Sequence, residues 1–160
     1  MKILIISLIA VLCTACNKDE NSFARNSFQD YCVVDGKEND LLDPNNPNGI
    51  NTSKINIYYL INNEKIKASE YFPNRDYPGF LISKPKGERK KYYITIYLNE
   101  KTTSGNIAYT YIEWNENDMD TIKTEVYKGA NILTSTMVAF NDSIWDWESA
   151  KEDYIYKIVK

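Results

Sequence analysis

The chain has 160 residues, 43% of them hydrophobic and 26% charged, and its formal net charge is −3 at pH 7. This composition is that of a globular protein, and the weakly acidic balance argues against nucleic acid as a partner. The sequence contains no histidine, which excludes Ser-His-Asp and Cys-His hydrolases, histidine-ligated zinc and an imidazole proton shuttle. Any chemistry would have to use carboxylates, Lys, Tyr or Ser.

The first predicted element is a signal peptide over residues 1–15. A single lysine precedes an apolar run over Ile3–Leu12, and two small residues lead to Cys16. A transmembrane helix needs about 20 apolar residues, so this shorter run is typical of a leader that is removed. We expect a lipoprotein signal in which Cys16 becomes the first mature residue and carries lipid. Cleavage after Ala15 without lipid is the alternative, because Cys13 stands where such signals usually have Leu.

Residues 16–27 are expected to form the lipidated cysteine and a flexible tether, since the stretch after Cys16 is polar and lacks periodicity. Residues 28–160 are then the β-rich domain. Cys32 is the only thiol left in the mature chain for an internal bond, so an internal disulfide is excluded. Its place in an apolar strand predicts a buried and inert thiol.

Turn residues divide the domain into short segments rich in Ile, Tyr, Val and Thr, which favour β-strands. The predicted strands are Phe28–Val34, Lys54–Ile61, Glu64–Lys67, Tyr92–Leu98, Ile107–Trp114, Thr121–Lys128, Asn131–Phe140 and Tyr154–Val159, with shorter segments at Gly79–Ser83 and Ser143–Trp147. Asp35-Gly36, Asn62-Asn63 and Asn141-Asp142 are tight-turn signals between them. A short helix is expected over Asp146–Asp153.

The spacing of these segments predicts the fold class. About eight strands joined mostly by hairpin-like turns, with no amphipathic helix between them, indicate an all-β fold, a single antiparallel β-sandwich or small barrel. Alternation predicts the core faces, as in Lys54–Ile61, where Ile55, Ile57 and Tyr59 share one side. The pattern alone does not distinguish a sandwich from a barrel.

The loop Asp40–Gly49 is rich in the oxygen ligands that calcium prefers. Its spacing does not fit an EF-hand, because Pro47, Asn48 and Lys54 stand where an oxygen ligand, a glycine and a glutamate are needed. Asx and Pro residues that cap turns explain the loop better. We therefore predict no metal site and no cofactor.

A second polar cluster lies near the end of the predicted strand Ile107–Trp114. Its carboxylates are Glu113, Glu116, Asp118 and Asp120. Two of them could act as an acid and base pair in glycoside hydrolysis only if one were desolvated, whereas carboxylates in a loop are usually solvated. The basic run Lys84–Lys91 could touch anionic headgroups or polysaccharide, but a charged turn needs no such role.

The thirteen tyrosines and three tryptophans supply flat rings of the kind with which β-sandwich modules hold sugars. Six of them lie opposite to, or beyond, the faces expected to form the core. These candidate ligand-binding residues are Tyr58, Tyr93, Tyr97, Trp114, Trp145 and Trp147. The alternative is purely structural, because Tyr is a favoured strand residue and cross-strand aromatic pairs stabilise a sheet without any ligand.

Several of these features resemble the small surface lipoproteins of Bacteroidota. Cys16 is followed by Lys18-Asp19-Glu20, which is similar to the lysine-plus-acid export signal of that group, and Asp40–Tyr59 and Tyr111–Lys123 are similar to segments of such proteins. The resemblance implies a lipoprotein at the outer membrane, exposed on the cell surface, and it brings no activity or catalytic residues. Two triplets also resemble the O-glycosylation acceptor of that phylum: Asp120-Thr121-Ile122 and Asp142-Ser143-Ile144.

Together these observations predict a non-enzymatic binding or interaction module of the bacterial cell envelope. Its partners would be the membrane, through lipid on Cys16, and an envelope protein or glycan. The alternative from another class is a small carboxylate-dependent, glycan-active enzyme. A structural or inhibitor-like lipoprotein whose loops plug a partner is a third reading, and the sequence does not separate it from the first.

Overall fold

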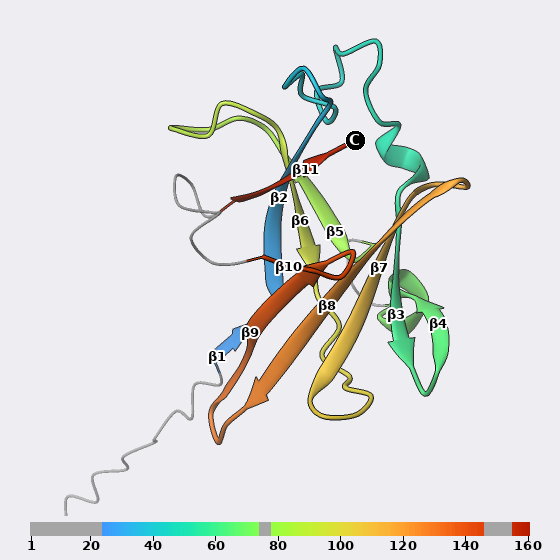
Figure 1. The fold of residues 1–160 in the computed structure, drawn as a ribbon, viewed down its shortest axis with the longest axis vertical. Coiled ribbons are helices and arrows are strands. Elements are labelled where there is room, and N and C mark those ends of the chain that lie inside the picture. The colour runs from blue at the N-terminus through green and yellow to red at the C-terminus, as the bar shows by residue number, and fades with distance from the viewer. Residues whose placement is uncertain (1–23, 74–77, 146–154) are drawn as a thin grey trace, which may run out of the picture.

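The computed structural model describes residues 24–73, 78–145 and 155–160, and it contains two packed β-sheets (Figure 1). The larger sheet has seven strands, of which six follow the order β1-β9-β8-β7-β3-β4 while β10 pairs with β9. Their bounds are β1 (Ala24–Asn26), β3 (Asn56–Ile61), β4 (Glu64–Lys67), β7 (Ile107–Asn115), β8 (Asp118–Lys128), β9 (Ile132–Phe140) and β10 (Ser143–Trp145). The smaller sheet has the order β11-β2-β6-β5, with bounds β2 (Phe28–Val34), β5 (Phe80–Ser83), β6 (Tyr93–Tyr97) and β11 (Ile155–Val159).

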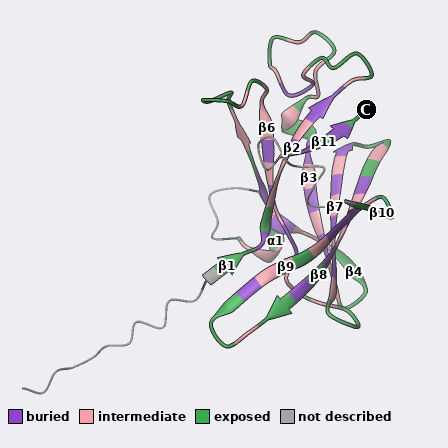
Figure 2. Ribbon diagram, turned by 60° about the vertical axis from the view of Figure 1, so that its left-hand side comes forward, coloured by how far each residue is buried: buried purple, intermediate pink, exposed green. Residues whose placement is uncertain are grey.

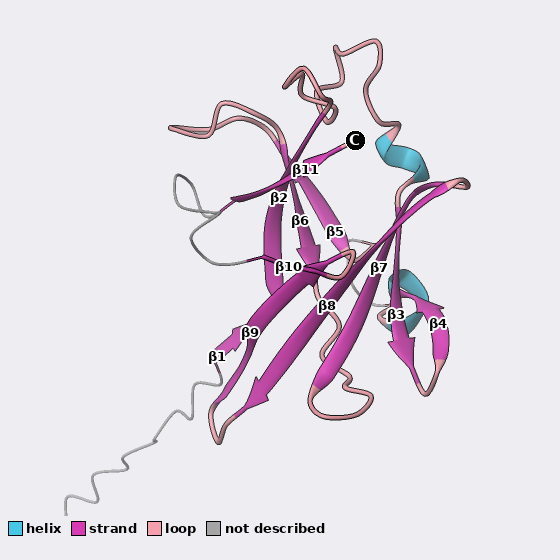
Figure 3. Cartoon of the chain, viewed as in Figure 1, coloured by secondary structure: helices cyan, strands magenta, loops and turns pink. Residues whose placement is uncertain are grey.

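Helical structure in the described part is limited to two short elements, the 3-10 turn η1 (Thr52–Lys54) and the single α-helical turn α1 (Ala68–Tyr71) (Figure 3). Among the described residues, none of the helices has the length and apolar character needed to cross a bilayer. The predicted helix over Asp146–Asp153 lies outside the described residues.

Alternating side chains build the core between the sheets, as the purple and pink bands along the strands show (Figure 2). Ile57 and Tyr59 of β3 and Ile94 and Ile96 of β6 are all buried, as predicted from their alternation. The two inner faces contribute to one continuous apolar cluster. The all-β prediction is confirmed, and of its two forms the structure has the sandwich: the sheets are packed face to face and do not close into a barrel.

The sheets are mixed rather than purely antiparallel. β1 runs parallel to β9, and β2 runs parallel to β11 with Tyr31 opposite Tyr156. Hairpin signals report only strands that are neighbours in sequence, and parallel partners must be joined by a long connection. Both parallel pairs join the beginning of the described chain to segments more than 100 residues later, so local patterns did not reveal them.

The chain crosses from one sheet to the other at Ser27, between β1 in the larger sheet and β2 in the smaller one. Ser27 is buried, and its carbonyl accepts a hydrogen bond from Leu98 N at 2.8 Å. β1 and Ser27 thus lie within residues 16–27, the segment expected to be the tether. The short β1 carries no apolar alternation, so it pairs through its backbone and left no strand signal in the sequence.

Candidate functional site

A cavity of about 520 Å³ opens at the end of the sandwich where the chain crosses between the sheets. Cavities of this size that combine aromatic walls with a few polar groups are the usual small-ligand sites of proteins. The aromatic lining consists of Phe28, Tyr59, Tyr71, Phe72 and Tyr97. The polar lining consists of Arg25, Ser27, Asn99, Glu100, Lys101 and Lys128. We call this cavity the crossing pocket.

One aromatic wall comes from β3 and α1. Tyr71 and Phe72 pack edge to face with ring centroids 4.7 Å apart, and each also meets Tyr59 edge-on at 6.2 and 6.1 Å. Such tilted arrangements are the favoured geometry of aromatic pairs. The Tyr59 hydroxyl donates to the carbonyl of Tyr97 at 2.9 Å, which ties this wall to the end of β6.

A second aromatic pair lies on the smaller sheet. Phe28 and Tyr97 are direct cross-strand partners, and their ring centroids are 6.4 Å apart at a tilted angle. The Phe28 side chain is 48% exposed. The pair thus brings ring surface to the pocket that water can still reach.

The polar side of the pocket is organised around Glu100. Arg25 donates from Nε to Glu100 Oε1 at 2.6 Å and from Nη2 to Oε2, and the Ser27 hydroxyl also donates to Oε1. Hydrogen bonding to Glu100 raises the pKa of the Arg25 guanidinium. This two-pronged ion pair ties β1 to the loop after β6 and gives the pocket rim a defined shape.

Asn99 holds the same loop from inside. Its Nδ2 donates to the carbonyls of Leu60 and Tyr109 at 2.9 and 3.1 Å, and its Oδ1 accepts from Lys101 N at 2.9 Å. With its amide satisfied, Asn99 is a structural support of the pocket rather than a group waiting for a ligand.

Two lysines, Lys101 and Lys128, complete the rim, and both are exposed. Within the described residues, neither side chain has a carboxylate partner. The lining therefore carries more positive than negative charge, since Arg25 is already neutralised by Glu100.

The predicted aromatic candidates do not form one surface. Tyr97 lines the crossing pocket, but Tyr58 lies on the outer face of the larger sheet, where its hydroxyl donates to Glu113 Oε2 at 3.0 Å. Tyr93 lies on the smaller sheet beneath Arg89, whose guanidinium carbon is 4.5 Å from the ring centroid. Burial, followed by the hydrogen bond to Glu113, raises the pKa of the Tyr58 hydroxyl.

Trp114 is only 1% exposed and belongs to the core. The inward face of β7 is formed by Ala108, Thr110, Ile112 and Trp114, the opposite of the face expected to be buried. Both faces of this strand carry apolar residues, so periodicity alone did not decide which one points inward. Trp114 therefore has no ring surface to offer to a ligand.

Three of the four predicted carboxylates, Glu113, Asp118 and Asp120, belong to structural networks. Asp120 is buried and accepts hydrogen bonds from Trp114 Nε1 at 2.6 Å and from Asn141 Nδ2 at 2.7 Å. Lys160 Nζ lies 2.5 Å from Asp120 Oδ2 and 2.7 Å from Asp118 Oδ1. None of the four predicted carboxylates lines the crossing pocket.

The remaining candidates fall where the structure gives no description of the side chain. Cys16 and Trp147 lie outside the described residues. Trp145 closes β10, and only its backbone position is described.

Cys32 carries a free thiol and is partly buried, and this burial raises the pKa of the thiol, as an unreactive thiol requires.

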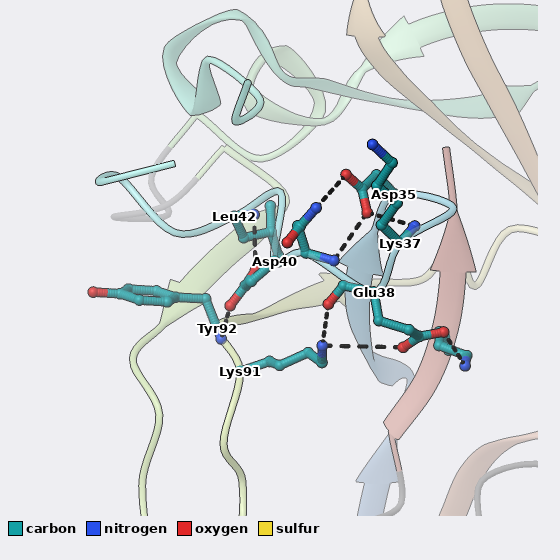
Figure 4. Close-up of polar contacts among 9 residues, drawn as sticks. Asp35, Lys37, Glu38, Asp40, Leu42, Lys91 and Tyr92 are labelled. Carbon is teal, nitrogen blue, oxygen red and sulfur yellow. Dashed lines mark hydrogen bonds and ion pairs between the residues drawn. The ribbon is translucent and has the colours of Figure 1, made fainter. Parts of the chain in front are cut away.

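The Asx-rich loop is tied to the fold by its own carboxylates (Figure 4). Asp40 accepts from Leu42 N at 2.9 Å through Oδ1 and from Tyr92 N at 2.7 Å through Oδ2. Beside it, Lys91 Nζ donates to the carbonyl of Glu38 at 2.6 Å. The bond from Leu42 N is an Asx turn of the expected kind, as are those from Asn45 N to Asp43 Oδ1 and from Asn48 N to Asn46 Oδ1, whereas the bonds from Tyr92 and Lys91 tie this region to the segment before β6. In the described ranges, no group of three or more Cys, Asp or Glu side chains is placed to hold a metal ion.

Sequence reasoning missed most of the crossing pocket. Tyr71 and Phe72 stand next to each other in a segment without periodicity, and Arg25 lies in the expected tether. The adjacent aromatic pair Tyr71-Phe72 was the one available signal. Only the tertiary fold brings these residues to Glu100.

No known protein family, no curated protein and no solved structure matches this chain.

Proposed function

We propose that this protein is a lipid-anchored, non-enzymatic binding module of a bacterial cell envelope, which holds an envelope protein or glycan in the crossing pocket. The lipobox-like segment ending at Cys16 supports the attachment, and the lysine-plus-acid stretch after it supports a place at the outer membrane. The observation that carries the binding role is the pocket itself, where aromatic rings and charged groups converge in one cavity of ligand size.

The charge pattern of the pocket favours binding over glycoside hydrolysis. Hydrolysis of a glycosidic bond needs two carboxyl groups about 5 to 10 Å apart. Among the described residues that line the pocket, Glu100 is the sole carboxylate, and both of its oxygens are engaged by Arg25. This described lining can orient a ligand through hydrogen bonds and stacking, and it contains one carboxylate where hydrolysis needs two.

The test is capture of envelope material by the mature protein and by two alanine variants. Tyr97→Ala removes a ring of the pocket, and we expect about tenfold weaker binding of the captured glycan or protein. Tyr111→Ala removes a ring from the outer face of β7, remote from the pocket lining, and should leave binding unchanged. Equal loss in both variants, or loss only in Tyr111→Ala, would place binding elsewhere and contradict the proposal.

A further inference from the structure

The end of the sandwich that carries the crossing pocket also carries exposed apolar side chains on its outer surface. Tyr127 and Ile132 flank the turn from β8 to β9 and are 54% and 40% exposed. They lie side by side over Gly129, because a Cβ atom there would be 3.2 Å from Tyr127 Cε1 and 2.9 Å from Ile132 Cγ2. Phe28, 48% exposed, adds a third apolar group beside β1.

Two exposed lysines belong to the same end of the molecule. Lys128 follows Tyr127 directly, and Lys101 lines the crossing pocket together with Lys128. Arg25 of β1 is opposite Leu133, one residue after Ile132, and is ion-paired with Glu100. The nearest exposed carboxylate on β8 is Glu125, three residues before Lys128. We call this region the basal end, and it consists of Arg25, Phe28, Lys101, Tyr127, Lys128 and Ile132.

The length of the chain before β1 limits how far the basal end can be from a lipid on Cys16. β1 begins at Ala24, eight residues after Cys16, so a fully extended connection spans about 28 Å. β1 pairs with the start of β9, so the described part of the chain begins at the basal end and not at the opposite end (Figure 1).

A tether this short places the basal end at a high effective concentration beside the bilayer, so even weak surface contacts become populated. Tyr and Ile side chains beside two exposed lysines fit the interface of an anionic membrane, where aromatic rings sit at headgroup level and each lysine is attracted by the surface potential. We propose, resting on the lipid attachment of the proposed function, that the basal end lies on the anionic membrane surface through Tyr127, Ile132, Lys101 and Lys128, so that the crossing pocket, whose rim includes both lysines, opens at headgroup level and takes its ligand there.

The experiment places a spin label on the lipidated full chain, bound to vesicles of phosphatidylethanolamine and phosphatidylglycerol. Cys32→Ser removes the native thiol, and the label is attached through Tyr127→Cys or, as control, through Met119→Cys at the other end of β8, where Met119 is 42% exposed. We expect the label at position 127 to gain access to oxygen and to be shielded from a water-soluble nickel complex. The label at position 119 should remain in water.

Charge variants test the electrostatic part. Lys101→Gln with Lys128→Gln should lower the ratio of membrane-bound to free label at position 127 by about fivefold per lysine. Lys84→Gln with Lys86→Gln removes two exposed lysines from the loop between β5 and β6, which projects at the other end of the molecule, and should change nothing (Figure 1). Circular dichroism of each variant verifies folding.

Flotation of the vesicles distinguishes the lipid attachment at Cys16 from the contact between the basal end and the membrane. If the chain floats with the vesicles but the label at position 127 stays in water, the basal contact is overturned, while the proposed attachment stands. If the chain does not float, both are overturned. Equal nickel accessibility at positions 119 and 127 also contradicts the inference, as would a loss of contact in the Lys84 and Lys86 variant equal to that in the basal one.

Discussion

Among the described residues, Asp120 is the one acidic residue that is buried. Its side chain is 8% exposed and takes hydrogen bonds from Trp114, Asn141 and Lys160, whereas the Asp118 side chain is 38% exposed and meets Lys160 alone. We expect Asp120→Ala to lower the free energy of unfolding by about 3 kcal/mol, because a buried indole N–H and an ammonium lose their acceptor. Asp118→Ala should cost less than about 1 kcal/mol.

Urea denaturation of the two variants measures this difference. A loss for Asp118→Ala as large as that for Asp120→Ala would show that the network is held by surface charge rather than by its buried acceptor.

Tyr31 predicts how stability changes in alkali. Burial, followed by the neighbouring Tyr156 and Asp30, raises the pKa of Tyr31 well above its usual range. The unfolded chain releases this proton near about pH 10, so the stabilising contribution is complete below that pH and is lost as pH rises toward the folded-state pKa. We expect the urea midpoint to fall above about pH 10. The fall should be smaller in Tyr31→Phe than in Tyr127→Phe, whose ring is exposed.

The comparison is between the slopes of the urea midpoint against pH above about pH 10. If this slope is the same in Tyr31→Phe, in Tyr127→Phe and in the parent protein, ionisation of Tyr31 does not limit stability. The comparison uses urea midpoints at several pH values, since the slope and not the absolute stability is at issue.

At the scale of elements, Gly79 decides how β5 meets β3 and α1. Its φ is +93°, and a Cβ atom would lie 2.7 Å from Ala68 Cβ and 3.0 Å from Ile57 Cβ. Gly79→Ala should therefore cost about 3 kcal/mol, combining left-handed strain with overpacking. Gly87 is the control for backbone strain without overpacking, because its φ is +64° and an added Cβ atom would have no neighbour within 4 Å. Gly87→Ala should therefore cost about 1 kcal/mol.

Thermal unfolding of the two glycine variants provides the measurement. Equal shifts in the midpoint would mean that the backbone moves to make room at Gly79, and that the close approach to Ala68 is not a constraint.

Elements that depend on local chemistry were predictable. Asn62-Asn63 and Asn141-Asp142 adopt positive φ at their predicted turns, and the hairpin of β3 and β4 forms, with β4 at its predicted bounds and β3 beginning at Asn56 rather than at Lys54. Asp35-Gly36 also lies in a turn, but the chain beyond it returns to β2 only through the single bridge between Val34 and Asp40. Local residues specify a turn, whereas the partner strand is chosen by burial across the whole chain.

At the scale of the whole molecule, the pocket could not be predicted because its parts meet only after distant segments pair. Arg25 and Glu100 are 75 residues apart and come together because β1 joins β9 while β2 joins β6. The aromatic candidates chosen from alternation were distributed over both outer faces and the core, since alternation gives a side of a strand but not the place of that strand in a sandwich. Of the four candidates whose side chains the structure describes, Tyr97 alone lines the pocket.

Metabolic labelling with palmitate tests the central proposal most directly, because both the envelope role and the basal contact depend on a lipid at Cys16. In bacteria that express the full chain, we expect the protein to incorporate labelled palmitate, and Cys16→Ala to abolish the label while Cys32→Ala retains it. A chain that takes up no palmitate, or one that is still labelled after Cys16→Ala, would contradict the account.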